Sequence, residues 1–313
     1  MTSYILKRLL STIPVMAMIA IFAFAVLRLA PGDPALMIAG EDASADQIAA
    51  IRHDLGLDQP FIPQFMSWVG NLLHGDLGLS LYTRQPVAEM IGQRIAPTFT
   101  LMLLTLVIAV VFGIVLGVIS AWRQNKVTDQ LIMLVMVLLF SIPNFVVAYI
   151  LTWFLGLKLG WLPVQGYTPL GDGLWASMRS LLMPAMALAS VYIALIGRIT
   201  RSAILENLRL DFVRTARAKG VSEGMVLFRH TLKNAAVPIV TIIGSGVGVL
   251  MSGSVVTENV FAIPGLGRLT VDAVLRHDYP VIQGVILLFG ALYVLVNLAV
   301  DIAYTFFDPR IKY

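Results

Sequence analysis

The chain has 313 residues, of which 58% are hydrophobic and 13% are charged. Soluble domains contain about 25% charged residues, so this composition excludes a soluble globular protein and indicates a polytopic membrane protein. The absence of cysteine excludes disulfides, thiolate metal sites and cysteine nucleophiles. The formal net charge is +4, and most of the basic excess lies in one loop, which argues for membrane orientation rather than nucleic-acid binding.

Six apolar stretches are long enough to cross a membrane, because a spanning helix needs about 20 apolar residues. The first follows Lys7 and Arg8 like the core of a signal peptide, but no small-residue cleavage site comes after it, so we expect a retained anchor. With both termini in the cytoplasm, 14 of the 22 Lys and Arg residues lie on that side, as the positive-inside rule requires. The predicted spans are Leu9–Ala30, Pro97–Ala121, Leu131–Leu157, Leu181–Gly197, Ala236–Val256 and Val281–Tyr304.

Residues 31–96 are expected to form an external helical segment after the first span. From Gly32 to Ala96 this segment has eight acidic and three basic residues. Ser44-Ala45-Asp46-Gln47 has the form of a capping box and predicts a helix that Gly56 ends. The segment could receive a soluble external partner, or it could be a packed structural addition, which the sequence supports at least as well. A second helix is predicted at 60–73, with an apolar side that packs on the membrane domain: Phe61, Phe65, Trp68 and Leu72.

The third span contains Pro143-Asn144, which interrupts helix regularity and places a polar side chain at membrane depth. Irregular backbone in a membrane is tolerated only against protein or water, so this pair indicates a shared bundle interior. In the following loop, Lys158–Ser180, Trp161 and Trp175 fit an interfacial aromatic belt. We assign no chemistry to that loop.

The loop at 198–235 is predicted to be cytoplasmic, because Gly197–Lys233 carries eight Lys or Arg residues and only three acids. It also has the signals of folded structure. Asp211 is predicted to cap a short helix that ends at Gly220, and Ser222 is predicted to cap a second one. A folded loop of this kind favours docking to a soluble partner, whereas the alternative is that its charge only sets the topology.

The fifth span is rich in glycine and serine. Small residues let helices approach closely in lipid, but they also leave room for a passing solute, and we give the two interpretations equal weight. Glu258 follows at the predicted outer mouth, where its carboxylate could meet an amine or cation, or could be an ordinary interfacial charge. The candidates for lining a pathway are therefore Asn144, Gly244, Gly248, Ser252, Ser254 and Glu258.

Several motifs are missing from the sequence. No Gly-Lys dipeptide occurs, so the chain has no phosphate-binding P-loop and is not expected to be an ATPase or another enzyme. Its four histidines are scattered, so neither a metal site nor a cofactor is expected in this chain. The centres of the spans are nearly free of charge, whereas a proton-coupled carrier usually has buried ionisable groups. Transport driven by a separate subunit is favoured, and a passive pore or secondary carrier is the alternative class.

The loop sequence Arg214-Thr215-Ala216-Arg217-Ala218-Lys219-Gly220 resembles the coupling signature of permease subunits of binding-protein-dependent ABC importers. That signature consists of E-A-A, three residues, Gly, nine further residues and then I-x-L-P. The positions that match are Ala216, Gly220 and Leu232. The departures, which fit the dipeptide/oligopeptide/nickel subgroup with its usual R-T-A-R-A-K-G, are Arg214, Thr215, His230 and Lys233. Other segments similar to that subgroup are Pro31–Pro34, Leu55–Pro60, Gly75–Gly78, Pro264–Gly267, Asp278–Val281 and Asp308–Arg310.

The resemblance covers essentially the whole chain and is nearest to the first permease subunit of dipeptide- or glutathione-type systems. It implies an all-α type I ABC importer permease fold, a single transmembrane domain over residues 1–313, in contact with the lipid of the bacterial cytoplasmic membrane. It also implies a second homologous permease, two ATPase subunits that bind ATP and Mg, and an external substrate-binding protein.

The same resemblance implies where the ATPase subunits make contact and what the cargo is. Contact is expected within 211–224, at Arg214, Thr215, Ala216, Arg217, Ala218, Lys219, Gly220, Val221 and Ser222. The cargo is expected to be a dipeptide, a longer peptide or glutathione. Nickel or another small solute carried by the same type of complex is the alternative.

Overall fold

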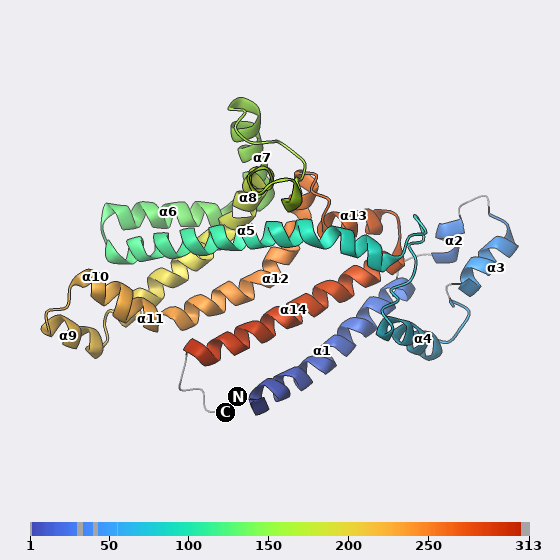
Figure 1. Ribbon diagram of the computed structural model, residues 1–313, viewed down its shortest axis with the longest axis horizontal. Helices are drawn as coiled ribbons and strands as arrows, with labels where there is room; N and C mark the ends of the chain where they lie inside the picture. Colours follow the sequence, from blue (N-terminus) through green and yellow to red (C-terminus); the bar gives the residue numbers. More distant parts are fainter. Residues whose placement is uncertain (1, 30–33, 40–42, 55, 308–313) are drawn as a thin grey trace. The chain divides into compact units, whose positions relative to one another are not determined.

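The computed structural model describes residues 2–29, 34–39, 43–54 and 56–307, and its regular structure there is helical apart from one isolated bridge between Leu79 and Pro86 (Figure 1). These residues divide into two compact units. Unit 1 contains Pro97–Ile263 and the described residues from Leu295 onward, and unit 2 contains Thr2–Ala96 and Pro264–Val294. The expectation of one domain over 1–313 stays a prediction. The motif residues outside the described part are Pro31, Gly32, Asp33, Leu55, Asp308, Pro309 and Arg310.

Unit 2 combines the N-terminal helices with a later helical pair. Within it α1 lies alongside α14, and a Cβ on Gly290 would come within 2.8 Å of the Ile19 side chain (Figure 1). Glycine therefore permits this close approach of two apolar helices. The helices of unit 2 are α1 (Thr2–Leu29), α2 (Pro34–Ala39), α3 (Ala45–Asp54), α4 (Phe61–Leu73), the start of α5 (Val87–Trp122), α13 (Leu266–Leu275) and the first part of α14 (Tyr279–Phe307).

The start of α3 confirms the predicted capping box. The Gln47 amide N–H donates to Ser44 Oγ at 3.3 Å, and the Ser44 amide N–H donates to Gln47 Oε1 at 2.9 Å. These two bonds satisfy backbone donors that the first turn of a helix leaves without partners. Gly56 follows the helix with φ of +62°, a conformation that glycine adopts without strain.

The aromatic side of α4 packs against α1, as predicted. Phe24 of α1 has its ring centroid 5.2 Å from that of Phe61, 5.3 Å from that of Phe65 and 5.3 Å from that of Trp68. Edge-on contacts of this kind add to the stability gained by burying the rings. Leu72, which was expected on the same side, is half-buried.

A buried carboxylate holds the loop after α4 to the α13–α14 corner. Asp278 is 4% exposed and accepts hydrogen bonds from Ser80 Oγ at 2.5 Å and from the Leu81 amide N–H at 3.0 Å. Ser80 Oγ in turn accepts from the Thr83 amide N–H at 2.9 Å. Because the charge is buried, these donors are needed to compensate its lost hydration. The carboxylate therefore fixes residues 80–83 on the apolar core of unit 2.

Unit 1 contains the remaining helices, and α8 packs against α6, α7 and α12. Of the most apolar stretch of α8, 72% is buried, against 28% for α5 and 33% for α12, so α8 is the central helix of this unit. The elements of unit 1 are most of α5, α6 (Val127–Ser141), α7 (Asn144–Leu151), the π-helix η1 (Thr152–Lys158), the 3₁₀ turn η2 (Leu170–Asp172), α8 (Leu174–Asn207), α9 (Asp211–Ala218), α10 (Glu223–Met225), the π-helix η3 (Val226–Thr231), α11 (Leu232–Asn234), α12 (Ala236–Val260) and the end of α14.

Glycines set the distance between α5 and α8. A Cβ on Gly117 would lie 2.6 Å from the Gly197 carbonyl oxygen, and one on Gly113 would lie 2.8 Å from Ile196 Cβ. Gly113 and Gly117 are four residues apart on α5, which is the spacing of small residues at close helix crossings in membranes. Sequence reasoning missed this pair, although the spacing was visible.

The third predicted span is two helices rather than one. Between α6 and α7/η1 the chain bends by 103°. Ile142, which precedes Pro143, has φ of −87° and ψ of 124°, outside the helical region. This is the conformation that a following proline favours, and Pro143 also lacks the amide donor that a continuing helix needs. The structure therefore confirms the predicted interruption at Pro143-Asn144 within the stretch Leu131–Leu157.

Among the described residues, four helices are long and apolar enough to span a membrane, namely α5, α8, α12 and α14. The bent pair raises this number to five if it is one span. The described apolar part of α1, Leu10–Ala25, is shorter than the length required. The six-span count and the cytoplasmic placement of both termini therefore stay predictions.

A buried ion pair joins three elements at one end of unit 1. Asp129 of α6 receives two hydrogen bonds from Arg201 of α8, each 2.8 Å long, and one from Ser120 Oγ of α5 at 2.5 Å. The Asn125 amide N–H donates to the same carboxylate at 3.0 Å. The Asp129 side chain is 5% exposed and that of Arg201 is 21% exposed. With all its partners present, this pair locks the α5–α6 turn onto α8.

We expect Asp129→Asn to destabilise the protein by about 3 kcal/mol or more, because it leaves a partly buried guanidinium without its counter-charge. The midpoint of thermal unfolding of the purified protein measures this loss. The matched control is Asp211→Asn, since the Asp211–Arg214 pair is 3.5 Å long and exposed. That control should change stability by less than about 1 kcal/mol. Equal shifts in the two variants would contradict the locking role of Asp129.

Candidate functional site

The basic loop between α8 and α12 is folded, and its first helix ends as predicted. Gly220 has φ of +76°, and its amide N–H donates to the Arg217 carbonyl at 2.9 Å. The Val221 amide N–H donates to the Ala216 carbonyl at 3.2 Å. These bonds satisfy carbonyls at the end of α9, and the positive φ at Gly220 favours glycine at that position.

The two predicted caps of this loop are corrected in detail. The N-cap of α9 is Leu210, which makes no side-chain capping bond, and Asp211 is the first residue inside the helix. There its carboxylate still lies near the positive end of the helix dipole. Ser222 does occupy the N-cap position of α10, but its side chain makes no capping hydrogen bond.

The loop has a small core of its own. Val213, Ala216 and Val226 are buried together, with Leu208 and Val221 packed beside them. Of the nine residues expected to contact ATPase subunits, Ala216 is 8% exposed and packs in this core, and its role as a contact residue stays a prediction. Val221 is half-buried. The exposed members are Arg214, Thr215, Arg217, Ala218, Lys219, Gly220 and Ser222.

An ion pair bridges the turn at Gly220. Arg217 donates from Nε and Nη2 to the two carboxylate oxygens of Glu223, at 2.8 and 2.9 Å. This side-chain hydrogen bonding raises the pKa of the Arg217 guanidinium. A two-point bond fixes orientation as well as distance, so it holds α9 and α10 in one geometry.

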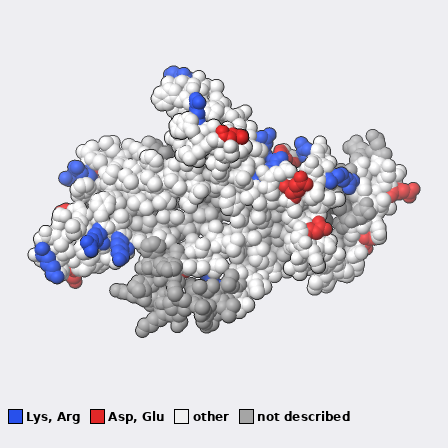
Figure 2. Space-filling model, in the orientation of Figure 1, with Lys and Arg blue, Asp and Glu red and all other residues white. Residues whose placement is uncertain are grey.

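The surface of this loop combines positive charge with apolar side chains. Figure 2 shows Lys and Arg gathered over the part formed by α9, α10 and α11. Sequence reasoning missed the apolar residues beside them, although large apolar side chains in a polar loop are a visible signal. These are Leu210, Phe212, Met225 and Phe228, which are 49%, 37%, 49% and 59% exposed. Exposed apolar groups rimmed by charge are typical of protein-binding surfaces.

The glycines of α12 divide between two faces of the helix. A Cβ on Gly244 would lie 2.2 Å from Val300 Cγ2, and one on Gly246 would lie 2.3 Å from Tyr192 Cε1. A Cβ on Gly253 would lie 2.7 Å from Leu188 Cδ1. These three glycines pack α12 against α8 and the end of α14. This contact supports the packing interpretation for Gly244, and its place in a pathway lining stays a prediction.

A further side of α12, next to Gly244 on the helix, forms an open face that carries small polar groups. Ser245, Ser252 and Asn259 are exposed there and Gly248 is half-buried, at intervals of three to four residues or their multiples. Their polar groups bond mostly within the helix, as with Ser252 Oγ and the Gly248 carbonyl at 3.5 Å. Of the predicted pathway residues, Gly248 and Ser252 lie on this face.

Two more predicted pathway residues are buried within the chain, and their place in a pathway stays a prediction. Ser254 is 0% exposed and donates to the Met251 carbonyl at 2.8 Å. Glu258 is also 0% exposed, and its Oε1 accepts from Thr98 Oγ1 at 2.7 Å. Glu258 therefore anchors α12 to the beginning of α5 within unit 1 and does not stand at an open mouth.

Asn144, the remaining candidate, is the first residue of α7 and is half-buried. Its Nδ2 would lie 3.5 Å from a Cβ placed on Gly253, so it lies beside α12. It is close to the packed face of α12, and its place in a pathway stays a prediction.

Known proteins resemble this chain over its full length. Residues 113–313 match the family model of the binding-protein-dependent transport system inner membrane component, and residues 1–102 match the model of its N-terminal region. A relative from Sinorhizobium fredii, named "Probable peptide ABC transporter permease protein y4tP", is 48% identical over 99% of both chains. The glutathione transport system permease protein GsiC of Escherichia coli is 42% identical over the whole of both chains.

Among solved structures, the inward-facing MetNI methionine ABC transporter has a chain that matches with a TM-score of 0.59 at 17% identity, covering 70% of this chain and 96% of that one. This likeness supports the type I importer permease fold, and the family's place is the bacterial inner membrane. The chain is therefore a multi-pass protein that belongs to the family of inner membrane components of binding-protein-dependent transport systems.

Proposed function

We propose that this chain is one permease of an ATP-driven importer of peptides, which include dipeptides, longer peptides and glutathione. The observation that supports peptide as the cargo is the full-length likeness, at 42–48% identity, to relatives named for peptide and glutathione transport. In this proposal the chain pairs with a second homologous permease, and a substrate-binding protein delivers peptide to the outer side. The chain itself hydrolyses no ATP, because ATP and Mg are bound by two separate ATPase subunits.

The coupling surface would be the exposed part of the α9–α11 loop. Its apolar residues Phe212 and Phe228 would enter the ATPase subunit, and the surrounding Arg and Lys residues would orient the contact. The Arg217–Glu223 ion pair keeps α9 rigid, so a movement of the ATPase subunit would be passed to α8 and α12 rather than absorbed in the loop. The Asp129–Arg201 pair would extend that stiffness from α8 to the α5–α6 turn.

The direct test is reconstitution of the chain with its companion permease, the ATPases and the binding protein in proteoliposomes. We expect a labelled tripeptide to accumulate in the compartment that holds the ATPases, and to do so only when that compartment contains ATP. ATP hydrolysis should rise when the peptide-loaded binding protein is added. Accumulation that does not need ATP would support the pore or carrier class instead and would refute this proposal.

We expect Gly220→Val to abolish uptake while the complex still assembles, because valine at φ of +76° is strained by about 1–2 kcal/mol and would shift the end of α9. Uptake and ATPase activity are measured on the same preparation, and hydrolysis should no longer respond to the loaded binding protein. The matched control is Gly224→Val in the same loop. A Cβ there meets nothing within 4 Å and φ is not positive, so transport should persist. Normal uptake with Gly220→Val would remove α9 from the coupling surface.

Substitutions of two glycines of α12 distinguish a role in lining the pathway from a role in helix packing. Gly248→Leu should lower uptake several-fold with little loss of complex yield, since it fills space on the open face. Gly244→Leu should lower the yield instead, because its side chain would clash with Val300. Complex yield after affinity purification and uptake per complex are measured for both variants. Unchanged uptake with Gly248→Leu would show that the open face of α12 does not line the pathway.

A further inference from the structure

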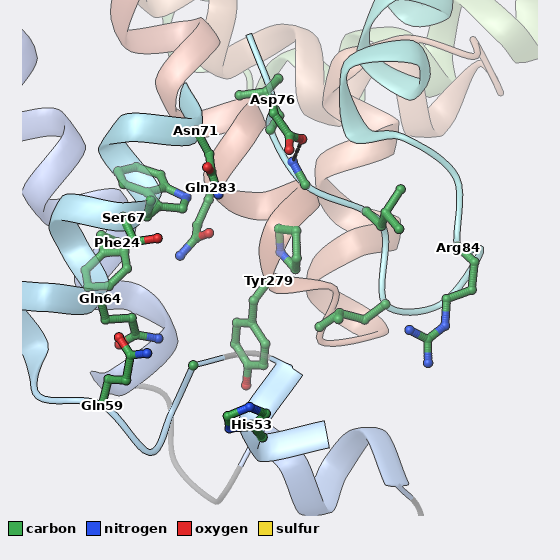
Figure 3. Close-up of a pocket in the computed structure, with 17 residues that line it drawn as sticks. Phe24, His53, Gln59, Gln64, Ser67, Asn71, Asp76, Arg84, Tyr279 and Gln283 are labelled. Atoms are coloured by element: carbon green, nitrogen blue, oxygen red, sulfur yellow. Dashed lines mark hydrogen bonds between the residues drawn. The ribbon is translucent and has the colours of Figure 1, made fainter. Parts of the chain in front are cut away.

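Unit 2 contains an open cavity of about 580 Å³, lined by α4, the residues that follow α3 and α4, and the beginning of α14 (Figure 3). This volume lies within the range of ligand pockets, about 300–1,000 Å³. The cavity is separate from the open face of α12, which belongs to unit 1. Neutral side-chain amides from three separate segments line it: Gln59, Gln64, Asn71 and Gln283.

Gln283 of α14 makes the strongest case that the cavity holds a ligand. Its side chain is 6% exposed, and its Nε2 has no hydrogen-bond partner in the described part of the chain. Figure 3 shows the amide extending into the cavity toward the side where Gln64 and Phe24 lie. A buried donor without an acceptor is costly, and most such groups in folded proteins are paired. A ligand carbonyl in the cavity would supply the missing acceptor.

The other lining groups narrow the chemistry of the ligand. Ser67 and Tyr279 add hydroxyl groups, and Phe24 and Trp68 add flat apolar walls. The carboxylate of Asp76 already accepts from the Gly78 amide N–H at 2.8 Å. An amide side chain both donates and accepts, which is the pattern that the N–H and C=O groups of a peptide bond need.

We propose that this cavity binds a short peptide, whose backbone carbonyl accepts a hydrogen bond from Gln283 Nε2. The amides of Gln64 and Asn71 pair with further peptide groups, and the rings of Phe24 and Trp68 cover the apolar parts. This proposal rests on the proposed function only for the class of the cargo, which is peptide. The site would hold cargo on the side predicted to be external, before the peptide enters the pathway.

Photo-crosslinking tests the site on the assembled permease–ATPase complex in lipid nanodiscs, without binding protein and without ATP. The probe is a tripeptide that carries a benzophenone side chain. We expect crosslinks to map to residues 59–71 and 279–283, and excess tri-alanine to suppress them. Maltotriose, a neutral ligand with many hydroxyls, should not compete. Suppression by maltotriose, or crosslinks confined to other segments, would overturn the assignment.

Matched variants test the role of the amides. Gln283→Leu and Asn71→Leu should weaken tripeptide labelling at least tenfold. Gln283→Leu should not lower the midpoint of thermal unfolding, because leucine has a similar size and removes an unpaired buried group. Gln93→Leu is the control, since Gln93 is exposed on α5 and bonds only to Glu89, at 3.2 Å, among the contacts described for it. Unchanged labelling with Gln283→Leu would refute the proposed contact.

Two further outcomes test where the peptide comes from and whether this inference depends on the proposed function. Labelling that occurs only when the binding protein is present, with crosslinks between the two proteins, would assign the cavity to a loop of that protein and overturn the free-peptide site. Labelling of the cavity in a complex that shows no ATP-driven peptide uptake would refute the proposed function and keep this inference.

Discussion

The close approach of other helices to α8 is the constraint on which unit 1 depends. Helices in lipid gain little from hiding apolar groups from water, so they associate through contact area and through backbones that come near each other. Gly197 is placed where a Cβ would lie 2.3 Å from Met136 Cε, and Gly117 leaves room for the Gly197 carbonyl. The helices α5, α6 and α12 can therefore approach α8 closely, because in each pair one of the two helices has glycine at the point of contact.

The same constraint explains how α12 serves two purposes. Gly246 and Gly253 face α8 and Gly244 faces the end of α14, whereas a further side of the helix carries the exposed Ser245, Ser252 and Asn259. A span rich in glycine and serine can therefore both pack against other helices and line a pathway. Because side chains of a helix point to different sides with its period, residues of the same segment can have different roles.

Features set by local chemistry were predictable from the sequence, and features set by distant partners were not. The capping box at Ser44, the end of α9 at Gly220 and the interruption at Pro143 each depend on a few adjacent residues. The burial of Glu258 was not predictable, because its partner, Thr98, is 160 positions away and no pattern reveals that contact. The fourth predicted span, Leu181–Gly197, covers only the middle of α8. The most apolar stretch of α8 has the lowest mean hydropathy among the four long apolar helices, 1.9, yet it is the most buried of the four. Its environment is protein rather than lipid, so small and polar residues are tolerated there.

The small core of the α9–α11 loop affects how readily proteases cleave the subunit before it is assembled. Three buried residues, Val213, Ala216 and Val226, hold little apolar area, so local opening of this loop requires far less free energy than opening of the helical bundle. Opening would present Arg214, Arg217 and Lys219 to proteases that cleave after basic residues. A companion protein seated on the loop would suppress that opening by mass action. In the proposed complex, an unassembled subunit would therefore be cleaved at this loop faster than an assembled one.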